Sequence, residues 1–518
     1  MKNKTGTLMI QGTASDAGKS LFVTALCRIF ARKGIKTVPF KAWNMSLNSY
    51  ITKNGKEIGI AQALQARAAL REAAVDMQPI LVKAMGKGQT QIIIKGEVDQ
   101  NINYQKRKND YLKIYEQTIK SSLQRLRKNN ELIIMEGAGS PAEINRTTPD
   151  FANMFTAELY NSPVLLISSI EKGGCLASLV GTLKLLAPAQ RKLIKGLIIN
   201  KFRGDFNLLK PAVEFLEDYT SKEVMAVLPY FKNLNLPEED SASLRLDNYP
   251  DDRADSEKRL KIAVIKLPHI SNFTDFNSLK MEADLYLKYV SKKINLLNFD
   301  LIIIPGTKTT TRDLQFLKES GLAAEIKKAN EAGIMIIGIC GGFQMLGQKL
   351  IDNEGTEGEI KEINGLGLLK IKTEFLKEKT THQVEVRLNP NQQLKNELPG
   401  FEAWEIFKGY EIHMGQTEYL NETEELFEII ERSGRKLKLK DGAVNQAGNC
   451  FGTYLHGLFD NDNFRSSLLN KLREKNNLSR TKFKNYNYQQ QIENNLDRLA
   501  DLVEENIDIN KLLNLSRR

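Results

Sequence analysis

At 518 residues the chain is longer than one hydrophobic core usually supports, so we expect two or three domains. Its composition, 41% hydrophobic and 26% charged, is that of an ordinary soluble protein, and no apolar run approaches the roughly 20 residues of a membrane span. The four cysteines have no paired spacing, which argues against a disulfide framework and favours the reducing cytoplasm. The net charge of +11 comes from dispersed lysines without a basic stripe, which favours a solvated lysine-rich surface over nucleic-acid binding. Attraction of a polyanionic substrate is the alternative.

Short apolar strands alternate with helix-length segments through the first half of the chain. This alternation predicts a parallel sheet with helices on both faces, in an α/β domain over residues 1–240. The expected helices cover 19–33 and 111–128, and the expected strands are 8–11, 37–40, 91–95, 131–135, 164–168, 197–200 and 224–228. The stretch after 237 is polar and acid-rich, and we interpret 241–258 as a linker.

A second α/β domain is expected over residues 259–476. Its expected long helix covers 311–331, and its strands are 261–266, 301–304, 335–339, 410–413 and 451–455. Residues 477–518 form a tail with a helical pattern at 492–505. The predicted fold class is therefore α/β, with two doubly wound domains.

A glycine-rich loop, GTASDAGKS at residues 12–20, separates the first expected strand from the first expected helix. Glycines let the backbone fold around phosphates, and the amides of the following helix favour negative charge. A ligand-free turn is the alternative, but the strand and helix on either side favour a phosphate-binding loop. The predicted contacts with ATP are Gly12, Thr13, Asp16, Gly18, Lys19 and Ser20.

Two further polar residues stand at expected strand ends. Glu136 follows the strand 131–135 and is well placed to hold Mg²⁺ together with the Ser20 hydroxyl, although a helix-capping role would also fit an acid there. Asn200 closes another strand and is a candidate adenine contact. The predicted cofactors are therefore ATP and Mg²⁺.

The second half contains a lone cysteine on an expected strand-to-helix turn. Cys340 lies in IIGICGGFQ at 336–344, and its neighbouring glycines permit the strained turn that presents a nucleophilic thiol. His456, in GTYLHG at 452–457, is the favoured base, and His413 is its rival. We expect the other cysteines to be core residues. A nucleotide site and a carbonyl-attacking thiol on one chain suggest an ATP-driven amidation that takes nitrogen from glutamine.

Several longer segments are far more specific than either motif alone. Together they resemble the cobyric acid synthase family over nearly the whole chain. The segments are PFKAWNMSLNS (39–49), EGAGSPAEIN (136–145), IINKFRGD (198–205), LPHISNFTDF (267–276), PGTK (305–308) and GYEIHMG (409–415).

The resemblance implies a first domain of the dethiobiotin-synthetase type and a second domain like class I glutamine amidotransferases. It implies that Lys41 joins the nucleotide site and that Cys340 and His456 release ammonia from glutamine. The implied substrate is adenosylcobyrinic acid a,c-diamide, whose remaining carboxylates are amidated through acyl phosphates to give adenosylcobyric acid in cobalamin biosynthesis. The implied partners are this corrinoid and L-glutamine, with no nucleic acid or membrane, and a homo-oligomer is compatible with the sequence.

The sequence departs from the family pattern at Trp43 and Ser169, with charge-conserving changes at Glu171 and Lys172. At Leu458 it departs from many glutaminases but resembles the cobyric acid synthase family. Trp43 replaces a glutamine in the segment expected to line the cleft, and Ser169 replaces an acid. Leu458 stands where many glutaminases carry the glutamate that orients the histidine, so the third member of a triad is unassigned. The alternatives are the sister cobyrinic acid a,c-diamide synthase, a P-loop ATPase switch that binds a partner, and a binding protein with a dead site.

Overall fold

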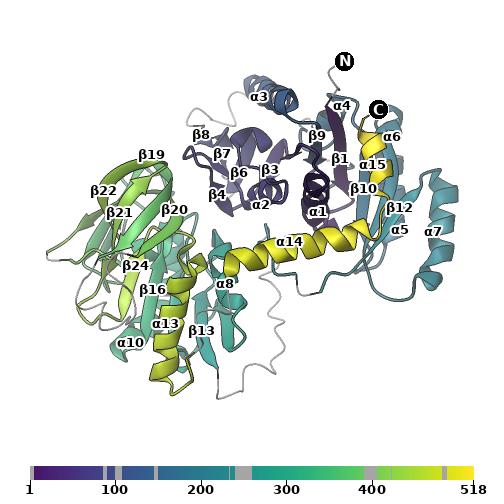
Figure 1. Ribbon diagram of the computed structural model, residues 1–518. Coiled ribbons are helices and arrows are strands. Elements are labelled where there is room, and N and C mark those ends of the chain that lie inside the picture. Colours follow the sequence, from purple (N-terminus) through teal and green to yellow (C-terminus); the bar gives the residue numbers. More distant parts are fainter. Residues whose placement is uncertain are drawn as a thin grey trace.

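The computed structural model describes residues 5–85, 90–99, 108–144, 150–232, 234–239, 259–389, 405–421, 423–480 and 487–517. Two α/β domains lie side by side, joined by a helix near the C-terminus (Figure 1). The linker predicted at 241–258 lies outside the described residues. Within the described part of the chain, no helix is long and apolar enough to cross a membrane.

The first domain is built on a six-stranded parallel sheet with the order β12-β11-β10-β1-β9-β2. Consecutive strand residues alternate between two apolar clusters, one on each face, as the twofold period of a strand requires. The strands are β1 (Gly6–Gly12), β2 (Thr37–Phe40), β9 (Leu132–Glu136), β10 (Val164–Ser169), β11 (Ile194–Phe202) and β12 (Val224–Pro229). The helices are α1 (Lys19–Arg32), α3 (Lys108–Asn129), α4 (Met154–Glu158), α5 (Cys175–Leu185), α6 (Pro188–Leu193) and α7 (Phe206–Thr220).

A smaller sheet inserted after β2 faces the second domain. It has the order β3-β6-β7-β8, with β3 (Trp43–Met45), β6 (Ile80–Ala84), β7 (Thr90–Ile94) and β8 (Glu97–Val98). A hairpin of β4 (Ser49–Ile51) and β5 (Glu57–Gly59) precedes α2 (Ile60–Ala68). The strand expected at 91–95 belongs to this sheet and not to the parallel one. It pairs antiparallel with β6, since the few residues between them are too short for a parallel crossover.

The second domain has a six-stranded sheet with the order β14-β13-β15-β16-β24-β23, parallel except at the β23 edge. Its strands are β13 (Leu260–Ile265), β14 (Leu285–Val290), β15 (Leu301–Ile304), β16 (Met335–Ile339), β23 (Ala443–Val444) and β24 (Cys450–Thr453). The helices before Asp462 are α8 (Asn277–Lys280), α9 (Thr310–Glu319), α10 (Leu322–Glu331) and α11 (Gly341–Leu346). The single helix expected at 311–331 is two helices, because Gly321 adopts the left-handed conformation (φ 77°) that ends one and begins the next.

A separate sheet, antiparallel except where β17 pairs parallel with β19, covers one side of this domain. It contains β17 (Lys349–Ile351), β18 (Glu362–Asn364), β19 (Ile371–Leu388), β20 (Ile406–Tyr419), β21 (Phe427–Arg432) and β22 (Arg435–Asp441). The strand expected at 410–413 is the middle of β20 and does not join the parallel sheet. An antiparallel sheet tolerates water on one face, which explains the mixed polar and apolar character of these long strands.

The tail returns to the first domain. After α13 (Asp462–Lys475), helix α14 (Tyr488–Glu504) runs from the second domain to the first, and α15 (Ile509–Ser516) ends beside β1 (Figure 1). Leu496 and Leu499 are fully buried in the cluster formed with α1. Ion pairs add to this contact, including Arg28 with Asp497 at 2.8 Å. The tail therefore completes the first domain's core.

We expect Leu499→Ala to lower the free energy of unfolding by about 2–5 kcal/mol, because it removes a fully buried side chain and leaves a cavity. Chemical denaturation followed by circular dichroism measures the loss. Asn494→Ala, on the exposed side of the same helix, is the control and should leave the unfolding midpoint unchanged. Equal midpoints for Leu499→Ala and wild type would show that the tail is not part of the core.

Candidate active sites

The phosphate loop connects β1 to α1, as its sequence predicts. The Lys19 ammonium folds over the loop and donates to the carbonyl oxygens of Ala14 at 2.8 Å and of Ser15 and Gly139 at 3.3 Å. Gly12 allows this, because a Cβ there would lie 2.9 Å from Lys19 Nζ. Gly18 has φ 98°, and a Cβ on it would collide with the Asn200 amide. The loop thus has the backbone shape of a phosphate cradle, with its lysine held inside.

Of the other residues predicted for the nucleotide site, Thr13 and Asp16 lie in this loop and Asn200 contacts it. Asn200 donates to the Ala17 carbonyl oxygen at 2.9 Å, so its amide supports the loop backbone. The Thr13 hydroxyl lies 2.8 Å from that of Ser168. Asp16 is largely exposed and faces Lys172 at 3.9 Å. The structure thus brings these residues together around one loop.

Glu136 is the centre of a buried polar cluster at the end of β9. It accepts hydrogen bonds from Ser20 at 2.7 Å, Lys41 at 2.8 Å and Gln65 at 2.5 Å. Burial alone would raise the pKa of Glu136, but the Lys41 ammonium and these hydrogen bonds hold it below its ordinary value. The carboxylate is therefore ionised at neutral pH.

The same cluster fits a magnesium ion. Hydroxyl and carboxylate oxygens are ligands that Mg²⁺ prefers, and it commonly takes one or two protein carboxylates together with nucleotide phosphates. Ser20 Oγ and Glu136 Oε1 are adjacent and both lie beside the phosphate loop. In the part of the chain that the structure describes, no group of three or more His, Cys, Asp or Glu side chains could hold a metal ion. A magnesium ion here would therefore need the nucleotide phosphates as further ligands.

A second carboxylate, that of Glu239, reaches Lys41 from the end of the first domain. Glu239 Oε2 lies 3.2 Å from Lys41 Nζ, and Oε1 accepts a hydrogen bond from Asn44. Burial raises the pKa of Glu239 in spite of the attraction of Lys41. Lys41 and Asn44 therefore form a set of donors that can receive a carboxylate next to the phosphate loop.

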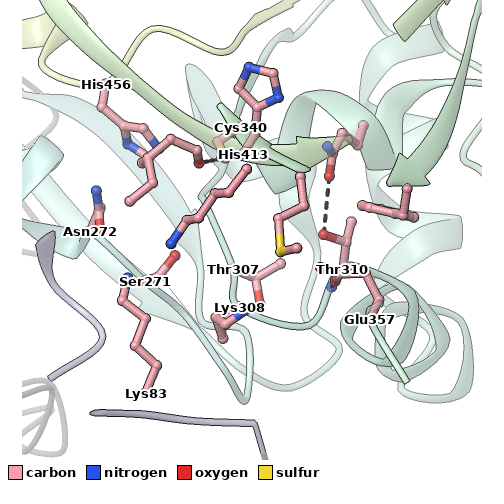
Figure 2. A pocket seen from close by; sticks show the side chains of 15 residues that line it. Lys83, Ser271, Asn272, Thr307, Lys308, Thr310, Cys340, Glu357, His413 and His456 are labelled. Atoms are coloured by element: carbon pink, nitrogen blue, oxygen red, sulfur yellow. Dashed lines mark hydrogen bonds between the residues drawn. The ribbon is translucent and has the colours of Figure 1, made fainter. Parts of the chain in front are cut away.

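Cys340 stands on a strained turn between β16 and α11. Its φ of 51° is in the left-handed region, which is unusual for a residue other than glycine, asparagine or aspartate. A Cβ on Gly342 would lie 1.9 Å from the Ile304 carbonyl oxygen, so only glycine fits this close approach. The turn directs the thiol into a pocket of about 470 Å³ (Figure 2).

His456 joins Cys340 in this pocket and is held by Asp275. Its Nδ1 lies 2.7 Å from Asp275 Oδ2, and Asp275 Oδ1 accepts from the Gly457 amide at 3.1 Å. Burial lowers the pKa of His456, but the charge and hydrogen bond of Asp275, together with hydrogen bonding to Cys340, raise it to about 10. The proton is thus favoured on the imidazole, and the three side chains form a cysteine–histidine–aspartate array.

His413 lines the same pocket but is engaged differently. Its Nδ1 lies 2.7 Å from the Gly415 carbonyl oxygen, and its ring stacks on Tyr454 with centroids 3.8 Å apart. The three remaining cysteines are buried, as expected, and burial raises the pKa of each thiol. Because His456 contacts both Cys340 and Asp275, whereas His413 is bonded to a backbone carbonyl, the geometry favours His456 over His413 as the base.

Comparison with known proteins identifies the two domains that carry these candidate sites. Residues 8–244 match the model of the CobQ/CobB/MinD/ParA nucleotide binding domain, and residues 261–464 match the CobB/CobQ-like glutamine amidotransferase domain. Cobyric acid synthase of Clostridium botulinum is 44% identical over 98% of this chain and 99% of its own length. That of Pelotomaculum thermopropionicum is 46% identical over 98% and 95%, and that of Caldanaerobacter subterraneus subsp. tengcongensis is 43% identical over 99% and 98%.

The chain belongs to the cobyric acid synthase family. It is accordingly an enzyme of cobalamin biosynthesis, a glutamine-dependent amidoligase with a nucleotide-binding domain and a glutamine amidotransferase domain. The α/β fold class and the family resemblance predicted from the sequence are confirmed.

Sequence reasoning missed Asp275 as the partner of His456. The two residues are 181 positions apart, and neither spacing nor periodicity connects them. The available signal was the place of Asp275 in the segment LPHISNFTDF, one of those that carry the resemblance to cobyric acid synthases. Leu458, at the position where many glutaminases have an acid, is a buried core residue.

Trp43 also has a structural role that the sequence did not show. Its ring meets Tyr115 edge-on at 5.2 Å and stacks near Phe151 at 6.3 Å. Its neighbours Lys41 and Asn44 reach the Glu136 cluster, so the segment does line the nucleotide site. The departure from glutamine at Trp43 is therefore accommodated by aromatic packing behind that site.

We expect Asp275→Asn to reduce glutamine hydrolysis by about 100-fold or more, because the neutral amide no longer holds the proton and orientation of His456. Activity with added ammonium, which bypasses glutamine, should remain close to that of wild type. A coupled assay for glutamate production, run beside the ammonium assay, measures both. Unreduced glutamate production would exclude a role for Asp275 in this array.

Proposed function

We propose that this enzyme converts adenosylcobyrinic acid a,c-diamide to adenosylcobyric acid by amidating the remaining peripheral carboxylates of the corrin ring. Each amidation consumes one ATP and one glutamine. The first domain activates the carboxylate, and the second supplies ammonia. Support comes from the family, from the phosphate loop and from the array at Cys340.

In the first domain, a substrate carboxylate oxygen attacks the γ-phosphorus of ATP. The bond from this phosphorus to the bridging oxygen of ADP breaks, so ADP is released and an acyl phosphate forms. Lys19 moves from its loop carbonyls to the phosphates, where its charge offsets theirs. Ser20 and Glu136 would hold Mg²⁺, which supplies further positive charge at the phosphates. Lys41 and Asn44, which bind the Glu239 carboxylate here, are the donors that would receive the carboxylate of the substrate.

In the second domain, the Cys340 sulfur attacks the side-chain amide carbon of glutamine. His456 keeps the thiol proton and passes it to the nitrogen of the tetrahedral adduct. The carbon–nitrogen bond then breaks, which releases ammonia and leaves a thioester on Cys340. Water then hydrolyses the thioester to glutamate. The ammonia attacks the acyl phosphate carbon, phosphate leaves, and the new amide bond forms.

One observation carries the proposal that ammonia passes between the domains: a single short segment touches both sites. Lys41 and Asn44 contact the acids of the nucleotide site. Four residues later, the Asn48 side-chain oxygen accepts from the Phe273 amide at 3.2 Å, and Asn272, next to Phe273, lines the Cys340 pocket. Because the sites share this buried interface, ammonia need not cross bulk water.

We expect Cys340→Ser to abolish glutamine-dependent amidation while ammonium-dependent amidation continues. The hydroxyl is a much weaker nucleophile than the thiol, whereas the nucleotide site is untouched. Lys19→Ala should abolish both routes, because neither can proceed without phosphoryl transfer. Phosphate release and amide formation are measured with each nitrogen source. Full glutamine-dependent turnover by Cys340→Ser would refute the nucleophile, and unchanged ATP turnover by Lys19→Ala would refute the loop assignment.

The substrate is tested by a mass-spectrometric time course with adenosylcobyrinic acid a,c-diamide, ATP, Mg²⁺ and glutamine. We expect successive amidations that stop at adenosylcobyric acid. No product from this diamide, together with amidation of the a and c positions when unamidated cobyrinic acid is supplied in its place, would identify the sister synthase. Intact ATP and glutamine hydrolysis without any corrinoid product would mean that the enzyme acts on another carboxylate.

A further inference from the structure

Three buried lysines line the Cys340 pocket, although the reaction proposed above uses none of them. Lys83, Lys308 and Lys379 all face it, and the exposed fractions of their residues or side chains are 11% or less. Burying an ammonium group is costly unless an opposite charge or hydrogen bond compensates it. The arrangement of their partners therefore indicates what the pocket is built to hold.

Two of these lysines share one acid. Glu57, behind the pocket wall, forms ion pairs with both Lys83 and Lys379. It also accepts a hydrogen bond from Ser49 at 2.7 Å. Burial alone would raise the pKa of Glu57, but the two lysines hold it far below its ordinary value. One carboxylate is thus matched against two ammonium groups.

Lys308 differs from the other two. Its exposed fraction is 8%. Among the residues that the structure describes, none forms an ion pair or hydrogen bond with its ammonium. Burial lowers the pKa of Lys308, and the strongest opposing influence is the charge of Glu357. Glu357 also lines the pocket, where it accepts from the Thr310 amide at 2.5 Å. Lys308 and Glu357 therefore face one space with opposite charges, without touching.

We propose that Lys308 and Glu357, together with Lys83 of the first domain, form the subsite that binds the α-carboxylate and α-ammonium groups of L-glutamine. The α-carboxylate binds the Lys308 and Lys83 ammonium groups, and the α-ammonium binds Glu357. A zwitterion inserted between separated opposite charges completes both ion pairs without changing the net charge of the pocket. This inference rests on the proposed glutaminase function of Cys340 and names the part of the site that recognises the substrate.

The contribution of Lys83 makes this subsite a product of both domains. Lys83 lies near the C-terminal end of β6 in the small sheet, and its side chain enters the pocket from the side of the first domain (Figure 2). Glutamine recognition therefore depends on the docking of the domain that uses ATP. An isolated second domain would keep the Cys340–His456–Asp275 array but lose part of the α-carboxylate subsite.

The test compares two alkylating agents that both react with the Cys340 thiol. The glutamine analogue 6-diazo-5-oxo-L-norleucine carries the α-carboxylate and α-ammonium, whereas iodoacetamide carries neither. We expect Lys308→Met and Lys83→Met to lower the ratio of the two second-order inactivation rates by roughly 10-fold or more, the value of a charge-assisted hydrogen bond. Because both rates refer to the same folded fraction, a partly unfolded preparation does not change their ratio.

Lys95→Met is the matched control, since Lys95 follows the neighbouring strand, pairs with Asp76 and is absent from the pocket lining. It should keep the wild-type ratio. A wild-type ratio in Lys308→Met would overturn the subsite. Failure of the glutamine analogue to label Cys340 in the wild-type enzyme would instead refute the proposed glutaminase function, so the two failures are distinguishable.

A second measurement uses hydrolysis in place of labelling. The ratio of kcat/KM for L-glutamine to that for its α-amide, which lacks the carboxylate charge, should fall by roughly 10-fold in Lys308→Met. Lys308→Arg retains the charge and should recover part of the preference. Unchanged discrimination in Lys308→Met would show that the α-carboxylate binds elsewhere.

Discussion

The buried polar contact between the two domains is the interaction on which both sites depend. Asn48 accepts from the Phe273 amide, Asn272 accepts from the Ser49 amide, and Glu57 binds Lys379 across the interface. All of these groups except the Lys379 side chain, which is 11% exposed, are buried. A shift that broke these contacts while the groups stayed out of water would cost about 1–3 kcal/mol for each neutral group and more for the ions. The interface is thus specific in register, because a small shift would break several hydrogen bonds together.

The parallel sheets explain why the reactive groups gather where they do. Gly12 ends β1, Glu136 ends β9, and Cys340 follows β16, so these groups lie at or just beyond the carboxyl ends of parallel strands. Loops at that edge carry the chemistry, while the strands behind them are apolar and rigid. Helix α14 links the two frameworks from outside: its first amide donates to Asp462 of the second domain, and its buried leucines pack on α1. The two parallel sheets and helix α14 therefore hold in place the loops on which the two sites lie.

Local patterns predicted much of this arrangement, and long-range pairing explains most of what they missed. The phosphate loop, Glu136, Cys340 and His456 follow from strand–turn–helix patterns within a few residues of each. Asp275 could not be found this way, since its contact with His456 is set by how two loops of the folded domain meet. The strand at 410–413 was predicted, but not its sheet, because a short segment carries no information about its pairing partner. Lys308 lies in the segment PGTK, which contributed to the resemblance, but its burial and that of Glu357 are properties of the tertiary structure that the sequence does not show.

The departures from the family pattern can now be weighed by what the chemistry requires. A histidine base needs an acceptor at Nδ1, and Asp275 provides it at 2.7 Å, so an acid two residues after His456 is not needed. Trp43 occupies an aromatic cluster, while Lys41 and Asn44 beside it present the polar donors. Ser169 removes one acid of the family pattern. Glu171 replaces an aspartate with the same charge and pairs with Lys201 and Arg203 at 3.4 and 3.1 Å. Geometry and not sequence position decides which group acts, so the contacts of Glu136 and of the Cys340–His456–Asp275 array form with tryptophan at position 43 and leucine at position 458.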